Sequence, residues 1–455
     1  MSLPTSVLIN KKIFILTLGC KVNQYESDAM LEALLSAGAV SGNENDADIC
    51  IVNTCSVTNM ADRKSRQMLS RMKKENPGAL IVATGCYVQA LEESKRRLEK
   101  NPGASSGRST GKEASAITAD LIIGNNRKRD IVRILTEYLS GEAVQDTVVD
   151  IAHDPEFEDL KLRMPLTHTR SYIKIQDGCN SFCSYCIIPF VRGRIRNKSL
   201  CDIVREAEIL AENGVRELVL TGINLSSYGD IGADTLIDVI EAVHSIPGIL
   251  RIRLSSLEPR VITDEFMQRL SRLPKLCPHF HLSLQSCCDS VLKRMNRKYT
   301  VDDINAIVKR IRGVYDRPAL TADIITGFPG ETDEEFEITL KNLEQLQLYE
   351  MHVFKYSRRK GTVADTMPGQ IPEPVKNLRS EKLISLGKEM KKNFEAFFSK
   401  DTLNVLIEEI VDTPAGKCYR GHTERYLLVD IPVESIGDSS PDMGRINTII
   451  SVSSS

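Results

Sequence analysis

Residues 177–186 read DGCNSFCSYC and place three thiols, those of Cys179, Cys183 and Cys186, within eight residues. They follow Tyr172–Ile175, a short run of β-forming residues that predicts a strand. In parallel barrels, the loops that follow the strands carry the catalytic groups. Three thiolates can hold three irons of a [4Fe–4S] cube and leave the fourth iron open to an exchangeable ligand. The stretch therefore predicts an iron–sulfur site at the end of a barrel strand.

Around this stretch, strand-length apolar runs alternate with helix-length segments, which predicts a partial (β/α)6 barrel. Ser199 is expected to cap the first crossover helix, and Gly214 follows its end. The expected strands are Tyr172–Ile175, Glu217–Leu220, Arg251–Leu254, His281–Leu284, Ala322–Ile325 and Met351–Phe354.

The N-terminal third repeats the same alternation and predicts a parallel α/β sheet domain. Its expected helix, Tyr25–Ser36, has an apolar stripe and stops near Gly38. Residues 101–115, rich in Gly, Ser and Lys, are expected to form a flexible insertion. The expected strands are Ile13–Leu18, Asp48–Asn53, Ala79–Thr84 and Asp120–Ile123.

After a predicted helix at Asn377–Phe398, three β-rich segments predict a small all-β domain. These segments are Asn404–Val411, Tyr426–Ile431 and Ile446–Val452. The 455 residues thus divide into three expected domains, residues 11–145, 165–395 and 398–455.

The composition is that of a globular protein, with 42% apolar residues and a formal net charge of -2. Residues 1–10 contain no apolar stretch of signal-peptide length, and no run is apolar enough to span a bilayer. A cytoplasmic protein is therefore expected. In that compartment the 12 cysteines indicate metal or redox use rather than disulfides.

A second set of three cysteines, Cys20, Cys55 and Cys86, follows three of the N-terminal strands. Ligand-binding groups of open parallel sheets collect outside the carboxyl ends of the strands, so the three thiols can converge. Taken singly, each could be a small buried hydrophobic residue. No role is assigned to Cys50, Cys277, Cys287, Cys288 and Cys418.

The alternative for Cys179, Cys183 and Cys186 is a structural zinc site. Zinc usually takes four protein ligands in such sites, and the next cysteine, Cys201, is expected on the following helix. The CxxxCxxC spacing, together with Thr221–Gly222 and Gly327–Gly330 at later strand ends, instead resembles the radical S-adenosylmethionine (SAM) superfamily.

The superfamily resemblance implies SAM as a cofactor and a role in binding it for seven residues. They are Phe182 and Tyr185 near adenine, Thr221, Gly222 and Asn224 near the methionine amino group, and Ser256 and Glu258 near the ribose. Ordinary packing or loop chemistry is the alternative for each.

The two cysteine sets in this order resemble the methylthiotransferase family, which joins an α/β domain with a second [4Fe–4S] cluster to a radical SAM barrel and a C-terminal TRAM-like β-barrel. Residues 18–27, LGCKVNQYES, and 352–362, HVFKYSRRKGT, resemble the branch that acts on N6-threonylcarbamoyladenosine in tRNA. The sequence departs from the family pattern at Cys287, Lys355 and Val363.

The resemblance implies a transferase that converts N6-threonylcarbamoyladenosine at position 37 of tRNA to its 2-methylthio derivative. Cys179, Cys183 and Cys186 would hold the cluster that cleaves SAM to a radical, and Cys20, Cys55 and Cys86 the cluster that delivers a methylated sulfur. A second SAM would be the methyl donor. Flavodoxin or ferredoxin is the expected electron donor, and a monomer is expected.

Two rival functions keep this chemistry but change the substrate, and a third discards the chemistry. The same transfer could act on isopentenyladenosine 37 of tRNA or on an aspartate of a ribosomal protein. Alternatively, the chain could be a non-catalytic iron–sulfur protein that binds RNA.

Basic residues directly after the third cysteine of the DGCNSFCSYC stretch could neutralise RNA phosphates, although a solvated loop is the alternative. They are Arg192, Arg194, Arg196 and Lys198. Near the C-terminus, Arg425 lies in a second basic group with Lys417, Arg420 and His422. Tyr419 and Tyr426 could stack on bases there, or simply pack.

Overall fold

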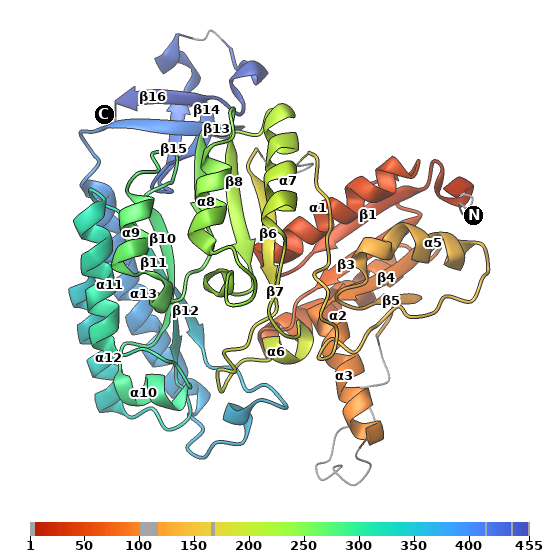
Figure 1. Ribbon diagram of the computed structural model, residues 1–455, viewed down its shortest axis with the longest axis horizontal. Helices are drawn as coiled ribbons and strands as arrows, with labels where there is room; N and C mark the ends of the chain where they lie inside the picture. The colour runs from red at the N-terminus through yellow and green to blue at the C-terminus, as the bar shows by residue number, and fades with distance from the viewer. Residues whose placement is uncertain (1–4, 101–116, 165–168, 415, 438–439, 454–455) are drawn as a thin grey trace. The chain divides into compact units, whose positions relative to one another are not determined.

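The computed structural model describes residues 5–100, 117–164, 169–414, 416–437 and 440–453 (Figure 1). The expected insertion at 101–115 lies outside them. The chain forms two compact units. Unit 1 comprises residues 1–166, 174–198 and 357–365, and unit 2 comprises residues 167–173, 199–356 and 366–455. The three expected domain boundaries remain a prediction.

Unit 1 is built on a five-stranded parallel sheet with the order β2-β1-β3-β4-β5. The strands are β1 Lys12–Thr17, β2 Val40–Ser41, β3 Ile49–Thr54, β4 Leu80–Gly85 and β5 Leu121–Ile123. All six residues of β3 are buried, as expected for a central parallel strand covered on both faces. The four predicted strands are confirmed to within one residue, and the two-residue edge strand β2 was not predicted.

Helices cover both faces of this sheet (Figure 1). They are α1 Lys21–Ser36, α2 Asn59–Glu75, α3 Cys86–Lys100 and α5 Ile131–Leu139. Ile51 of β3 packs in one apolar core with Met30 of α1 and Ile134 of α5. Its neighbour Val52 packs in the opposite core with Leu69 of α2. The strand order is that of a doubly wound sheet whose order reverses between β1 and β3, where ligand sites form.

The DGCNSFCSYC region supplies three further elements, which lie in unit 1 except for residues 171–173 at the start of the first strand. Strand β6, Ser171–Asp177, pairs antiparallel with β7, Arg196–Asn197, and the short helix α6 spans Ile188–Val191. The basic segment after the cysteines therefore folds back to pair with β6 and does not form an open loop.

Unit 2 contains five of the six parallel strands that were expected to build the barrel. β8 Glu217–Gly222 pairs with β9 Arg251–Leu254, and β11 Ala319–Thr326 lies between β10 His279–Gln285 and β12 Glu350–Lys355. Parallel bridges Ile252↔Leu276 and Leu257↔Leu282 connect the β9 region to the β10 region. Every predicted barrel strand overlaps an observed one.

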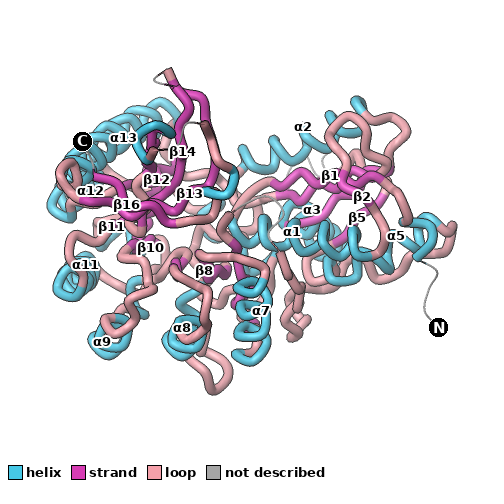
Figure 2. The backbone as a smooth tube through the Cα atoms, turned by 90° about the horizontal axis from the view of Figure 1, so that it is seen from above, coloured by secondary structure: helices cyan, strands magenta, loops and turns pink. Residues whose placement is uncertain are grey.

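An outer layer of helices surrounds these strands, as α8, α9 and α11 show in Figure 2. Ser199 caps α7 as predicted, because its Oγ accepts from Asp202 N at 3.1 Å. The helices of the unit are α7 Leu200–Glu212, α8 Leu236–His244, α9 Asp264–Leu270, α10 Asp289–Arg294, α11 Val301–Val314, α12 Asp333–Leu346 and α13 Glu373–Ala396.

The C-terminal segment is a four-stranded antiparallel sheet with the order β15-β14-β13-β16. Its strands are β13 Thr402–Thr413, β14 Gly416–Thr423, β15 Leu428–Pro432 and β16 Ile449–Ser453. Within unit 2 it is joined to the barrel by Arg251, whose guanidinium donates to the carbonyls of His422 at 2.9 Å and Asn404 at 2.7 Å. No helix in the described part of the chain is long and apolar enough to cross a membrane.

Candidate active site

Cys20, Cys55 and Cys86, which we call the auxiliary trio, lie at the carboxyl ends of three neighbouring strands. Cys20 is the N-cap of α1, Cys55 follows β3, and Cys86 is the first residue of α3. Burial, with smaller contributions from the charges of Cys86 and Cys20, raises the pKa of the Cys55 thiol to about 12. Arg192 Nε donates to Cys86 Sγ at 3.3 Å and its Nη2 donates to Asn23 Oδ1 at 2.7 Å, and Cys20 Sγ lies 3.9 Å from the same Asn23 Oδ1. These shared partners place the loops of Cys20 and Cys86 side by side, as the convergence requires.

The approach of the first two loops depends on Gly19, whose φ is +111°. A Cβ on Gly19 would lie 2.9 Å from Cys55 Cβ and 3.0 Å from its Sγ, too close for a side chain. Three sulfurs at a sheet edge are a donor set that suits iron, which would hold them as thiolates despite the burial. The auxiliary trio therefore fits a [4Fe–4S] cluster.

Asn23 of the LGCKVNQYES motif holds the first two cysteine loops in place. Its Nδ2 donates to the carbonyls of Leu18 at 2.7 Å and Thr54 at 3.0 Å. Asn53 Nδ2 in turn donates to Asn23 O and to Ser27 Oγ, both at 3.0 Å. These side chains are buried, so the motif acts from inside the fold rather than at its surface.

Cys179, Cys183 and Cys186, which we call the SAM trio, lie on the loop after β6. Cys179 N donates to Gly193 O at 3.1 Å, and Cys186 N donates to Cys183 O at 3.0 Å. Gly178 has a φ of +72°, and a Cβ there would collide with the carbonyl of Arg194. The loop is tightly folded back on the chain that follows it, with its three sulfurs on one short turn.

The structure corrects most of the predicted basic stripe. Arg192, Arg196 and Lys198 are buried, at 0%, 2% and 3% exposure. Lys198 pairs with Asp159 at 2.8 Å, and Arg196 donates to the Arg192 carbonyl at 2.5 Å. These three cations therefore cannot meet a phosphate in this fold. Arg194 alone is exposed, and its guanidinium lies 4.6 Å from the Phe182 ring centroid.

Arg192 belongs to a buried cluster of three cations and three carboxylates. The other members are Lys128, Lys174, Glu26, Asp177 and Glu158. Burial alone would raise the pKa of Glu26, but Arg192, Lys128 and Lys174 hold it well below its ordinary value. Equal numbers of opposite charges allow the cluster to remain ionised in the core. No local sequence pattern predicts this cluster, because its members are far apart in the chain.

Residues 357–365 include the second half of the HVFKYSRRKGT motif. They contact the loop of Cys55 and the loop of the SAM trio, both in unit 1. Arg359 is buried and donates to Ser56 Oγ at 2.6 Å, next to Cys55, and to Asp62 Oδ2 at 2.5 Å. Ala364 N donates to Ser184 O at 2.7 Å, inside the SAM trio. This short segment therefore joins the auxiliary trio to the SAM trio.

The residues expected near the SAM methionine and ribose lie at strand ends in unit 2. Thr221 and Gly222 end β8, and Asn224 begins the turn that follows. Glu258 N donates to Ser226 Oγ at 2.7 Å, which joins the loops after β8 and β9. The Glu258 carboxylate pairs with Arg297 at 3.1 Å and Arg260 at 3.3 Å. Ser256 lies on the same loop, half-buried.

Phe182 and Tyr185, expected beside adenine, lie within the SAM trio loop and are half-buried. Phe182 has a positive φ of 45°, and its ring meets Phe190 edge-on with 6.0 Å between centroids. A left-handed conformation is uncommon for a bulky aromatic residue and marks a constrained loop. The adenine role of both residues stays a prediction.

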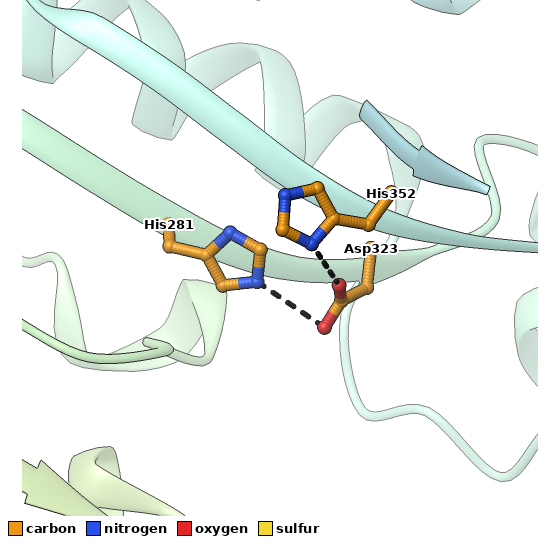
Figure 3. Close-up of side chains that lie close together, drawn as sticks. All are labelled: His281, Asp323 and His352. Carbon is orange, nitrogen blue, oxygen red and sulfur yellow. Dashed lines mark ion pairs between the residues drawn. The ribbon is translucent and has the colours of Figure 1, made fainter. Parts of the chain in front are cut away.

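In the described part of unit 2, His281, Asp323 and His352 form a polar group that the sequence does not predict (Figure 3). The three residues lie on β10, β11 and β12. His281 Nε2 is 3.2 Å and His352 Nδ1 is 3.7 Å from the Asp323 carboxylate. Two imidazoles and a carboxylate are ligand types that bind transition metals, although here the two rings already pair with the acid. His352 is the first residue of the HVFKYSRRKGT motif.

Some of the C-terminal candidates for RNA contact are exposed, and others are already bound to groups of the protein. Lys417 and Arg420 lie on β14, and Arg420 pairs with Asp430 at 2.7 Å. Arg425 is corrected, because its guanidinium donates to the carbonyls of Arg317 and Asp316, both at 2.9 Å. It fastens a turn to the barrel instead of facing solvent.

Tyr419 and Tyr426 follow the packing alternative. Tyr419 is fully buried, and its hydroxyl accepts from Asp442 N at 2.7 Å. Tyr426 stacks on His422 with 4.3 Å between ring centroids and lies against Arg253. Neither ring is free to stack on a base.

The three departures from the family pattern have different surroundings. Cys287 is fully buried. Lys355 donates to Asn377 at 2.8 Å and to Glu373 at 3.2 Å on α13. Val363 is 64% exposed.

With this geometry established, two family comparisons define the class of protein. Residues 173–343 match the radical SAM superfamily, and residues 12–104 match a family described as uncharacterized protein family UPF0004. A solved radical SAM methyltransferase, TsrM from Kitasatospora setae, has the same fold with a TM-score of 0.53 and 15% identity, covering 78% of this chain and 77% of that one. The chain is a radical SAM protein.

Curated relatives narrow the class to one family. The chain is 35% identical to a threonylcarbamoyladenosine tRNA methylthiotransferase MtaB of Bacillus subtilis (strain 168), covering 91% of this chain and 88% of the relative. The Thermotoga maritima protein of that name is 37% identical over 84% and 82%. A tRNA-2-methylthio-N(6)-dimethylallyladenosine synthase of Acetivibrio thermocellus is 33% identical over 96% and 89%.

The chain therefore belongs to the radical SAM tRNA methylthiotransferase family. It is an enzyme that uses SAM and [4Fe–4S] clusters, and its substrate class is tRNA.

Proposed function

We propose that this enzyme adds a methylthio group to C2 of N6-threonylcarbamoyladenosine at position 37, in the anticodon loop of tRNA. Relatives named for this nucleoside are 35% and 37% identical over most of the chain. The LGCKVNQYES motif and the second half of the HVFKYSRRKGT motif lie at the cysteine sites. The observation that carries the proposal is the contact of residues 357–365 with both cysteine loops, through Arg359 and Ala364.

The auxiliary trio and the SAM trio would each hold one [4Fe–4S] cluster. When bound, the clusters and SAM supply the electron, the sulfur and the methyl group, chemistry that side chains cannot supply themselves. The chain contributes the frame. Gly19 and Gly178 let the cysteine loops approach, Asn23 holds two of them together, and Arg359 fixes the segment that joins the two trios. An external reductant such as flavodoxin or ferredoxin would reduce the SAM-trio cluster.

Transfer to isopentenyladenosine 37 is the nearest competing substrate, because a relative named for that nucleoside is 33% identical over 96% of the chain. Nucleoside mass spectrometry separates the two. The chain is expressed in a host that makes both nucleosides but lacks both methylthio products. The proposal expects the methylthio derivative of threonylcarbamoyladenosine alone. A methylthio product of isopentenyladenosine alone, or none in tRNA, would overturn it.

Cys55→Ala and Cys50→Ala form a matched pair for the sulfur-delivering site. Both thiols are buried, but Cys50 packs inside β3 whereas Cys55 belongs to the auxiliary trio. We expect C55A to lose the methylthio nucleoside while it still releases 5′-deoxyadenosine from SAM. C50A should retain both activities. Release of 5′-deoxyadenosine by the unmodified enzyme also excludes a non-catalytic RNA-binding protein.

A further inference from the structure

Arg192 is fully buried and directs its guanidinium at the auxiliary trio and at the base of the SAM trio. Nε donates to Cys86 Sγ at 3.3 Å. Nη1 meets Glu26 Oε1 at 2.5 Å and Asp177 Oδ2 at 3.3 Å. Nη2 donates to Asn23 Oδ1 at 2.7 Å and to Glu26 Oε2 at 3.1 Å. A single side chain thus contacts a cysteine sulfur, two carboxylates and an amide.

Two of these partners connect Arg192 to the other cysteine loops. Asn23 binds the carbonyls of Leu18 and Thr54, which precede the loops of Cys20 and Cys55. Asp177 accepts from Gly178 N at 2.8 Å, one residue before the SAM trio begins. Arg192 therefore contacts the auxiliary trio directly at Cys86 and reaches the loops of Cys20 and Cys55 through Asn23. The contact with the SAM trio passes through a carboxylate.

A purely structural role would be to neutralise Glu26, but Glu26 already has two other cations. Lys128 Nζ lies 2.5 Å from Glu26 Oε2 and Lys174 Nζ lies 3.1 Å from Oε1. Neutralisation of this acid does not explain why the Arg192 Nε–H points at Cys86. Hydrogen bonds to cysteine sulfurs and nearby charge set the reduction potentials of iron–sulfur clusters. A cation and an N–H donor both favour the more negative, reduced state.

We propose that Arg192 is a positioning residue that raises the reduction potential of the auxiliary cluster, through its Nε–H···Sγ hydrogen bond to Cys86 and its positive charge. The inference rests on the proposal that the auxiliary trio holds a cluster, and not on which nucleoside is modified. The SAM-trio cluster is shielded from the same charge by Asp177, so its potential depends less on Arg192.

The test uses the full chain with Cys179, Cys183 and Cys186 replaced by Ala, so that only the auxiliary cluster is loaded. Redox titration of the anaerobically reconstituted protein, followed by electron paramagnetic resonance, gives its potential, and iron analysis gives its occupancy. Arg192→Lys keeps a charge but loses the planar Nε–H, and Arg192→Gln loses the charge. We expect about four irons per chain throughout. The potential should fall in R192K and fall further in R192Q.

Lys128→Met is the matched control, because it removes a buried cation from the same Glu26 carboxylate. Lys128 reaches sulfur only through Asn125, whose Oδ1 accepts from Lys128 and whose Nδ2 lies 3.8 Å from Cys86 Sγ. It should lower the unfolding midpoint like the Arg192 variants but shift the potential less. In the converse background, with Cys20, Cys55 and Cys86 replaced by Ala, R192Q should leave the SAM-trio potential nearly unchanged.

Iron content separates the possible failures. If the parent variant binds no iron at the auxiliary trio, the proposed cluster assignment fails and this inference fails with it. If iron is present and R192K and R192Q keep the parent potential, Arg192 is structural only. An equal shift in K128M would also overturn the inference, since any buried charge would then suffice. If R192Q does not fold, R192K alone decides by the same criterion.

Discussion

Gly178 shows how little room separates the SAM trio from the chain that follows. Its φ of +72° is a left-handed conformation, and its missing Cβ would occupy the space of the Arg194 carbonyl. Gly141 has a similar φ of +75° but nothing within 4 Å of a built Cβ. Substitution of Gly141 therefore tests backbone strain alone, whereas substitution of Gly178 tests strain together with a steric collision.

Gly178→Ala is expected to cost about 3 kcal/mol or more in unfolding free energy, because the strain of a left-handed alanine adds to a backbone collision. Gly141→Ala should cost only about 1 kcal/mol, from strain alone. Urea unfolding measures both. G178A should also bind less iron at the SAM trio, whereas G141A should bind the normal amount. Equal losses in the two variants would mean that the Arg194 contact is unimportant.

At the same scale, cysteines were predictable from the sequence and their buried partners were not. Cys20, Cys55 and Cys86 each follow an apolar strand, so topology alone brings them to one edge. Arg192 and Lys198 were read as a solvent-facing stripe because the local sequence contains no acid. Their partners, Glu26 and Asp159, come from other parts of the chain, and no local pattern reports such pairing.

At the scale of elements, apolar periodicity predicted the parallel strands well and failed at β14. Residues 416–423 read GKCYRGHT, and of the four buried residues, Cys418, Tyr419, Gly421 and Thr423, only the first two have apolar side chains. Such a strand is defined by its two partners, β13 and β15, rather than by its own composition. The helices were easier, because capping residues such as Ser199 act within one turn.

The N-terminus of α12 carries a capping box whose stability depends on pH. Thr332 caps the helix. The Glu335 carboxylate accepts a hydrogen bond from Thr332 N and pairs with Arg294. The Arg294 and Ser290 hydrogen bonds lower the pKa of Glu335 to about 2, although partial burial opposes them. A carboxyl with a lowered folded pKa stabilises the fold above its unfolded pKa, near about 4.3, and loses this contribution as pH falls through about 2.

Glu335→Gln should therefore cost about 1 kcal/mol at neutral pH and almost nothing near pH 2, since side chains at this partly exposed site are screened by solvent. Denaturant unfolding of both proteins across this range measures the difference. Glu337→Gln is the control: Glu337 lies on the same helix as Glu335 but in an exposed pair with Lys382 of α13, and its loss should change little at any pH. A pH-independent cost of E335Q would contradict the assignment.

At the scale of the whole molecule, a net charge of -2 leaves tRNA binding to local groups of cations. Burial removes Arg192, Arg196 and Lys198 from that role, and Arg425 is fastened to backbone carbonyls. Arg194 in unit 1 and Lys417 in unit 2 remain exposed, each on a segment the sequence analysis linked to RNA. We propose these two as phosphate contacts.

A phosphate contact releases counterions, so its loss reduces the slope of log affinity against log salt concentration by about 0.7–0.9. Arg194→Ala and Lys417→Ala should each reduce the slope by this amount and weaken tRNA binding about 3–10-fold at low salt. Arg425→Ala should leave the slope unchanged, because its guanidinium is occupied by Arg317 and Asp316. Lys309→Ala, on the exposed surface of α11, controls for the loss of one positive charge anywhere. Fluorescence anisotropy with an unmodified tRNA at several salt concentrations gives all four slopes. If R425A reduces the slope as much as K417A does, Arg425 contacts RNA and its assignment as a purely structural residue is wrong.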